Sequence, residues 1–198
     1  MKLTLPEKLK PYSGVINFMI ILLVSHFFWK YTVLGEDDNE IVRFFGLNIS
    51  QPFIFMASHT AQVSYSLLKW LGFNVTLNDL NVIRHLGSGN GVHIVWSCTG
   101  IKQAYILFCI LAFSRGPWKH KLWYIPLGLL CVYLFNIVRI TFIAGVIDSH
   151  PQQFEFWHEH VTKYAFYAMI FGLWVIWEEK IRIAPNPPKG GFKTPLLI

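Results

Sequence analysis

The long apolar runs of this chain limit its fold more than any other feature. The longest covers residues 122–147 and contains one charged side chain, Arg139, while residues 14–34 form a second run. A helix needs roughly 20 mainly apolar residues to cross a bilayer. Charged residues make up only 14% of the 198 residues, whereas soluble domains contain about 25%. We therefore predict one integral membrane domain covering residues 1–198.

Four apolar segments are predicted to cross the membrane. They cover residues 14–34, 98–113, 122–147 and 161–177. A fifth segment, residues 52–72, is apolar enough to cross but contains many hydroxyl and amide side chains. It is predicted to be an interfacial, re-entrant or spanning helix. The predicted fold class is thus an all-α polytopic membrane protein with four to five transmembrane helices.

The distribution of charge predicts how these helices are oriented. Basic residues cluster in residues 114–121 and in the tail, residues 178–198, and cytoplasmic flanks of membrane spans are enriched in Lys and Arg. Acidic residues instead follow the first and third spans, at Glu36, Asp37, Asp38, Glu40, Asp148, Glu155 and Glu159. We predict a protein of the cytoplasmic (inner) membrane with a cytoplasmic basic tail. The net charge of +6 is interpreted as topology, and no nucleic-acid partner is predicted.

Residues 73–97 have a different pattern and are predicted to form an outward-facing hairpin. Residues 74–77 and 92–95 alternate between apolar and polar side chains, and a glycine-rich segment at residues 87–91 lies between them. The glycine spacing fits neither the dinucleotide-binding nor the Walker pattern, so it predicts a turn. The hairpin would lead directly into Cys98.

Cys98 is the candidate nucleophile. The other two cysteines, Cys109 and Cys131, lie inside apolar runs, where a thiol usually packs as a small hydrophobic group. Cys98 lies among small and polar residues just before an apolar helix. The N-terminus of a helix favours the thiolate form. The alternative interpretation is a buried structural thiol.

Arg139 is the second candidate, because it lies inside an otherwise apolar predicted span. A charge at that depth usually faces a polar cavity or a partner, and a guanidinium could stabilise a thiolate or an oxyanion. Asn136 lies three residues earlier on the same helical face and is predicted to orient or bind the substrate. The alternative for Arg139 is snorkelling to the interface.

His158 and His160 stand just before the last predicted span. An imidazole at the membrane surface could take the thiol proton and later protonate a leaving amine. His85, His93 and His150 are weaker candidates for this role. Two alternating histidines could also bind a metal, but no further cluster completes a ligand set, so neither a metal nor another cofactor is predicted.

Three short motifs occur in a fixed order along the chain. They are Ser97-Cys98-Thr99-Gly100 at a helix start, Asn136-x-x-Arg139 in a later span, and a histidine before the last span. Together they resemble the exosortase/archaeosortase family of membrane-embedded cysteine transpeptidases. The resemblance covers residues 73–177, and the chain looks like a small, minimal member of that family.

The resemblance implies a function at the outer face of the membrane. Exported proteins with a C-terminal sorting signal would be the substrates. Cys98 would attack a backbone carbonyl to form a thioester, Arg139 would stabilise charge, and His158, or alternatively His160, would shuttle the proton. A glycan or lipid acceptor would then take the protein, or water would make the enzyme a protease.

Two other classes of function remain open from the sequence. The first is a non-enzymatic membrane assembly or scaffold subunit, in which Arg139 pairs with an acidic group of a partner and Cys98 has no chemical role. The second is a small transporter, but transporters usually contain paired repeats and broken helices, and the sequence shows none.

Overall fold

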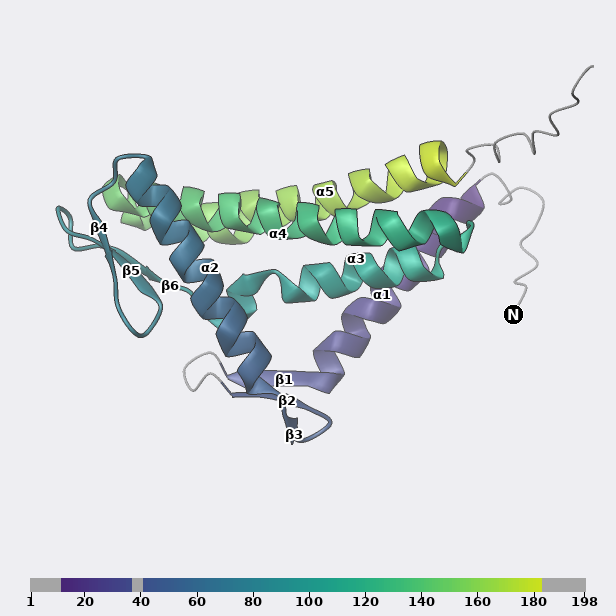
Figure 1. The fold of residues 1–198 in the computed structure, drawn as a ribbon, viewed down its shortest axis with the longest axis horizontal. Coiled ribbons are helices and arrows are strands. Elements are labelled where there is room, and N and C mark those ends of the chain that lie inside the picture. The colour runs from purple at the N-terminus through teal and green to yellow at the C-terminus, as the bar shows by residue number, and fades with distance from the viewer. Residues whose placement is uncertain (1–11, 37–40, 183–198) are drawn as a thin grey trace, which may run out of the picture.

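The computed structural model describes residues 12–36 and 41–182, which fold mainly into helices (Figure 1). The α-helices are α1 (Ser13–Thr32), α2 (Ser50–Trp70), α3 (Ile101–Phe113), α4 (Trp118–Ser149) and α5 (Thr162–Ile176). The short helical turns are η2 (Trp96–Thr99), η3 (Pro151–Gln153), and the wider π-type turns η4 (Phe156–Val161) and η5 (Trp177–Ile181). The predicted mainly helical fold is therefore confirmed in its broad class.

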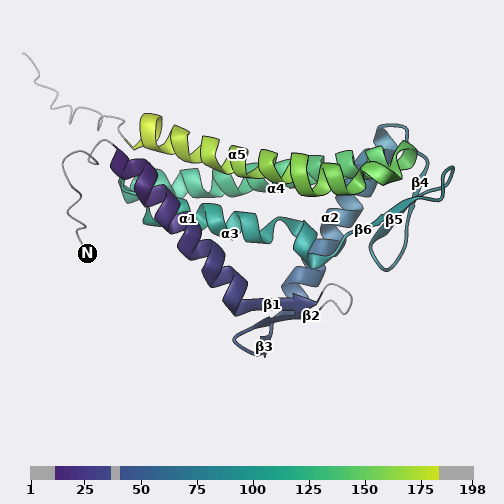
Figure 2. The same ribbon diagram turned by 180° about the vertical axis from the view of Figure 1, so that it is seen from behind.

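Helices α3, α4 and α5 run side by side, while α1 and α2 lean away from them and approach each other at a small sheet (Figures 1 and 2). The main core lies between α1, α3, α4 and α5. Its buried members include Phe18, Ile106, Leu107, Ile110, Leu111, Tyr124, Val132, Phe166, Ile170 and Trp174. Packing in this apolar core positions the start of α3 along the length of α4.

The basic loop before α4 and the end of α5 meet at one end of the molecule. Trp177 Nε1 donates a hydrogen bond of 3.2 Å to the carbonyl of Arg115, and a ring nitrogen of His120 lies 3.1 Å from the carbonyl of Ile181. This is consistent with a loop and tail that face the same side of a membrane. Residues 183–198 of the predicted tail, and the acidic residues 37, 38 and 40, lie outside the described residues.

Two helices, α1 and α4, are long and apolar enough to cross a membrane. They coincide with the predicted spans 14–34 and 122–147. Helix α3 is a shorter apolar helix of 13 residues, and α5 has 15 residues, so the structure leaves the predicted number of four to five spans open. The 32 residues of α4 extend over about 48 Å at 1.5 Å per residue. This length exceeds a hydrocarbon core of about 30 Å.

Two small antiparallel sheets accompany the helices. The first joins β1 (Val33–Glu36), β2 (Ile41–Phe44) and β3 (Leu47–Asn48), and the second joins β4 (Val75–Leu77), β5 (Val82–His85) and β6 (Gly91–His93). The first sheet was not predicted from the sequence. The predicted first span extends to Leu34, whereas α1 ends at Thr32 and the chain continues as β1.

The second sheet corrects the predicted hairpin. Strands do form near both predicted positions, but β4 and β6 do not pair with each other. Strand β5 lies between them, with Val75 opposite His85 and Val82 opposite His93. The intervening strand was missed because residues 82–85 lie between two turns and show no clear alternation.

This sheet packs on the far half of α4. Buried side chains of the sheet and of α4 form one cluster with α2, including Val75, Ile83, Val92, Ile140, Ile143, Ala144, Ile147, Ala61 and Leu68. His85 is only 2% exposed and its Nε2 bonds to the carbonyl of Ala144 at 2.8 Å. Its Nδ1 lies 3.4 Å from Asp148. His85 therefore ties the sheet to α4 and is not placed as a catalytic base.

Candidate functional site

Cys98 lies in the short turn η2, between the second sheet and α3. Gly100 follows it with a left-handed φ of 77°, and α3 begins only at Ile101. The predicted helix over 98–113 is therefore broken: Cys98 stands before the break and is not the first residue of α3. The half-buried thiol residue packs beside the cluster that contains Ile140 of α4.

Asn136 holds the backbone of the candidate nucleophile. Its side-chain amide donates a 2.9 Å hydrogen bond to the carbonyl of Cys98, although Asn136 belongs to α4 and is almost fully buried. Its Oδ1 is buried without a hydrogen-bond partner among the described residues. Asn136 was predicted to orient or bind the substrate. The contact in the structure is with the backbone of Cys98, and the predicted role toward the substrate stays a prediction.

Gly100 is required at the break, which gives a direct prediction. A Cβ at this position would lie 3.1 Å from Asn136 Cγ, and the left-handed conformation costs an L-residue roughly 1–2 kcal/mol. We expect Gly100→Ala to lower the free energy of unfolding by about that amount and to reduce activity. Chemical denaturation in mild detergent measures the first effect. Gly172→Ala is the control, because no atom lies within 4 Å of its added Cβ, and it should not destabilise the protein.

Arg139 connects α4 to the start of α5. Its Nε donates to the Thr162 hydroxyl at 3.1 Å, and this hydroxyl donates at 3.1 Å to the carbonyl of His158. Arg139 also lies within electrostatic range of Cys98 and of Glu159. The guanidinium is thus bonded to the first residue of α5, next to the turn that contains the candidate base, and lies within electrostatic range of the candidate nucleophile.

Sequence reasoning missed Thr162. A threonine in the first turn of an apolar helix has an ordinary explanation, because its hydroxyl often bonds to the carbonyl four residues earlier. That is the bond it makes to His158. Two features of the sequence could have identified Thr162. It lies four residues after His158, and a buried Arg139 needs a hydrogen-bond acceptor.

His158 lies in the π-type turn η4, and such turns often occur at functional sites. Its ring stacks on Phe154, with centroids 5.1 Å apart and planes 12° apart. Its Nδ1 lies 3.1 Å from Glu159 Oε1, and Lys163 in turn binds Glu159 at 3.0 Å. Because Nδ1 is engaged by the carboxylate, Nε2 is the nitrogen that remains for proton transfer.

His158 and His160 differ clearly in their surroundings. Burial lowers the pKa of His158 below its ordinary value, and the nearby positive charge of Arg139 lowers it further, while Glu159 partly opposes both. His158 is therefore neutral at physiological pH, as a general base must be. His160 is exposed, and its contact is with the Phe156 ring. The geometry favours His158 over His160.

The remaining histidine and cysteine candidates lie elsewhere. His93 is exposed in β6 and His150 is exposed after α4. Cys109 is buried in α3, Cys131 is half-buried in α4, and no disulfide joins the described cysteines. In residues 12–36 and 41–182, no group of three or more His, Cys, Asp or Glu side chains is arranged to hold a metal ion.

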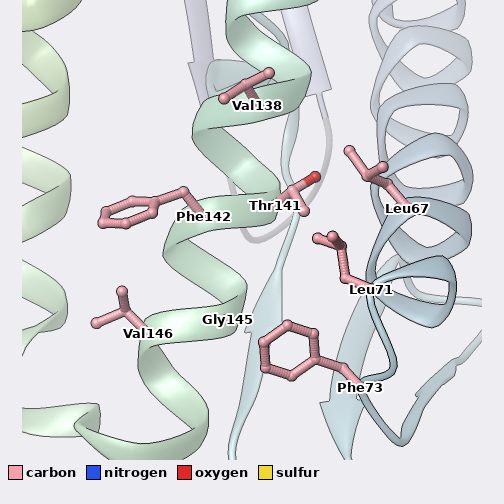
Figure 3. Close-up of a pocket in the computed structure, with 8 residues that line it drawn as sticks. All are labelled: Leu67, Leu71, Phe73, Val138, Thr141, Phe142, Gly145 and Val146. Carbon is pink, nitrogen blue, oxygen red and sulfur yellow. The ribbon is translucent and has the colours of Figure 1, made fainter.

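A large apolar cavity lies close to the site but does not contain it. It measures about 480 Å³ and opens between α2 and α4 (Figure 3). Its lining includes Val138 and Thr141, which flank Arg139 in sequence, together with Leu67, Leu71, Phe73, Phe142, Gly145 and Val146. Cys98, Arg139 and His158 do not line this cavity, so the candidate site is defined by the contacts of Arg139 and not by this cavity.

Comparison with known proteins identifies the family. Residues 42–176 match the family model described as transmembrane exosortase. No curated protein and no solved structure matches the chain. The matched range contains Cys98, Asn136, Arg139 and His158 and covers more than half of the chain. The chain therefore belongs to the transmembrane exosortase family.

Proposed function

We propose that this protein is a cysteine transpeptidase or protease that cleaves a C-terminal sorting signal of exported proteins. The observation that carries the proposal is the position of Arg139: it lies within electrostatic range of Cys98 and is bonded through Thr162 to the turn that holds His158. These interactions support a single site formed by residues from η2, α4 and η4. Membership of the exosortase family supports the same activity.

The first half of the reaction forms a thioester. His158 Nε2 takes the proton from the Cys98 thiol, and the sulfur attacks the backbone carbonyl carbon of the substrate. The carbonyl electrons move to oxygen, and the Arg139 guanidinium stabilises the resulting oxyanion. Collapse of this intermediate breaks the C–N bond, and the proton on His158 passes to the leaving amine.

The second half releases the product. A hydroxyl or amine of an acceptor, of the glycan or lipid class, gives its proton to His158 and attacks the thioester carbonyl. The C–S bond breaks and the Cys98 thiolate leaves. If water attacks instead, the product is a free carboxylate and the enzyme acts as a protease. Asn136 keeps the carbonyl of Cys98 in place throughout.

The proposed site faces the exterior or periplasm across the cytoplasmic membrane. Two features support this orientation. The basic loop and the end of α5 meet at the end of the molecule opposite the second sheet (Figure 1), and positive residues favour the cytoplasmic side. From Trp118, roughly 20 residues of α4 suffice to cross the hydrocarbon core. This distance places Arg139 near the outer boundary.

The pH dependence of activity tests the role of His158. Because the pKa of His158 is lowered by burial and by Arg139, the active neutral form persists as the pH falls below 6.5. We expect the acid limb of kcat/KM to have its midpoint below 6.5. Glu159→Gln removes the group that favours the imidazolium and should move this midpoint still lower. An upward shift, or a midpoint above 6.5, would contradict the assignment.

A matched control for this measurement is Glu155→Gln. Glu155 is also an exposed acidic residue close to η4, but it does not contribute to the charge environment of His158. Its replacement should leave the midpoint unchanged. If the loss of any nearby negative charge were enough, the midpoint would shift equally in both variants. The proposed effect shifts the midpoint only in Glu159→Gln.

The decisive experiment for the function is capture of the thioester. The purified full-length protein is mixed with a membrane fraction that contains exported precursors, quenched in acid, and analysed by mass spectrometry. We expect an adduct on the peptide containing Cys98 that is released by neutral hydroxylamine. His158→Ala protein should form it far more slowly. An adduct on another residue, or none with confirmed precursors present, would overturn the proposal.

A further inference from the structure

A second, smaller cavity reaches the turn η2 that contains Cys98. It measures about 240 Å³ and is lined by Ser97, the chain neighbour of Cys98, and by Trp96 from the same turn. Lys30 at the end of α1 and Lys102 in the first turn of α3 also line it. Five elements, α1, β1, α2, η2 and α3, therefore meet around this space.

Positive charge gathers in this cavity, and its described lining contains no carboxylate. Lys102 is half-buried and lies within electrostatic range of both Lys30 and Lys163, and His26 of α1 lies within range of both cavity lysines. Among the side chains that the structure describes, no acidic group forms an ion pair with Lys30 or Lys102. Like charges held this close repel each other, and a bound anion would relieve the repulsion.

Trp96 contributes a further donor. Its indole Nε1 is buried and has no acceptor among the described residues, and an indole N–H can only donate. The ring itself is held closely by the backbone at Gly35, where a Cβ would approach it to 2.5 Å. A buried donor without an acceptor is costly, so an oxygen-rich ligand would supply the acceptor that this N–H group lacks.

We propose that this cavity is a binding site for a phosphate group, held by Lys30, Lys102 and Trp96. Lysine is a common phosphate ligand, and none of the described residues that line the cavity is a carboxylate that would repel an anion. Lys30 lies in the last turn of α1, whose 20 residues match the thickness of a hydrocarbon core. The cavity is therefore at the level where the phosphates of membrane lipids lie.

The role of this site rests on the proposed function. A phosphate-bearing molecule bound here would have the atoms next to its phosphate close to the thioester on Cys98, which suits an acceptor in the second half of the reaction. The sequence offered a partial signal, because Lys102 stands one helical turn after Cys98 and Lys30 interrupts the first apolar run. It could not show that the two lysines share a cavity.

The test measures binding to the full-length protein in uncharged detergent. Native mass spectrometry follows titration with phosphatidylglycerol and, as a neutral probe, diacylglycerol, while equilibrium dialysis follows radiolabelled inorganic phosphate. We expect saturable binding of a phosphate-containing probe, weakened about tenfold or more by Lys30→Gln with Lys102→Gln, since one charge-assisted hydrogen bond is worth more than a tenfold change. Lys69→Gln with Lys119→Gln removes two exposed lysines elsewhere and should have no effect.

The outcomes distinguish a lipid headgroup from free phosphate as the ligand. They also test this binding site separately from the proposed function. Binding of phosphatidylglycerol alone identifies a lipid headgroup as the ligand. Binding of inorganic phosphate as well identifies the phosphate group itself. Either result supports the site if the double variant loses the binding. Unchanged affinity in the double variant, or no binding of either probe, overturns it. All titrations are repeated in Cys98→Ala protein. Because binding does not need the thiol, its result stands whether or not the thioester is found.

Discussion

Replacement of Cys98 by alanine is expected to abolish processing of exported precursors in the native host. The sulfur forms and breaks the covalent bond in both halves of the proposed reaction, and loss of a catalytic nucleophile typically slows such a reaction by several orders of magnitude. Uncleaved precursors should accumulate in the membrane fraction, as detected by immunoblotting. Cys98→Ser should behave in nearly the same way, because a hydroxyl is a much weaker nucleophile at neutral pH.

The control for this experiment is Cys109→Ala. Cys109 is buried in the core face of α3, so its replacement tests general destabilisation without touching the site. Protein levels of both variants should equal those of the wild type. If Cys98→Ala is present at normal levels and every exported precursor still matures, Cys98 is structural and the enzyme assignment is wrong. If Cys109→Ala also blocks processing, destabilisation explains both results.

The sequence predicted the apolar helices well and the connections between them poorly. The apolar runs over 14–34 and 122–147 correspond to α1 and α4, because a chain in lipid must make its backbone hydrogen bonds within each helix. The strands β1 to β3 were not predicted because they are short. They are two to four residues long, too short for an alternating pattern to be distinguished from the end of a span.

The candidate site shows the same limit. Cys98, Arg139 and His158 were found because each is an unusual residue beside an apolar segment. The positioning contacts were not found, because the bond from Asn136 joins residues 38 positions apart and that from Arg139 to Thr162 joins residues 23 apart. Such contacts depend on how α3, α4 and α5 pack, which no local pattern records. Gly100 was placed inside a predicted span that begins at Cys98, although its positive φ ends the preceding turn.

Replacement of Arg139 by glutamine is expected to reduce kcat/KM by about 10²- to 10³-fold, the usual effect of removing one oxyanion donor. The loss should have two parts. The oxyanion loses its cation, and the Cys98 thiolate loses a positive charge within range, so the rate at which iodoacetamide alkylates Cys98 should fall as well. Arg84→Gln, an exposed arginine of β5, is the control and should change neither quantity.

Two further variants separate charge from geometry at Arg139. Arg139→Lys retains the charge, but one ammonium cannot reproduce both the Nε bond to Thr162 and a planar guanidinium face, so activity should stay well below that of the wild type. Thr162→Val keeps the shape and removes the hydroxyl bonds to Arg139 and His158. It should lower kcat more than it raises KM, while the thiol remains reactive. If Arg139→Lys were fully active, charge alone would suffice, and the link through Thr162 to His158 would have no catalytic role.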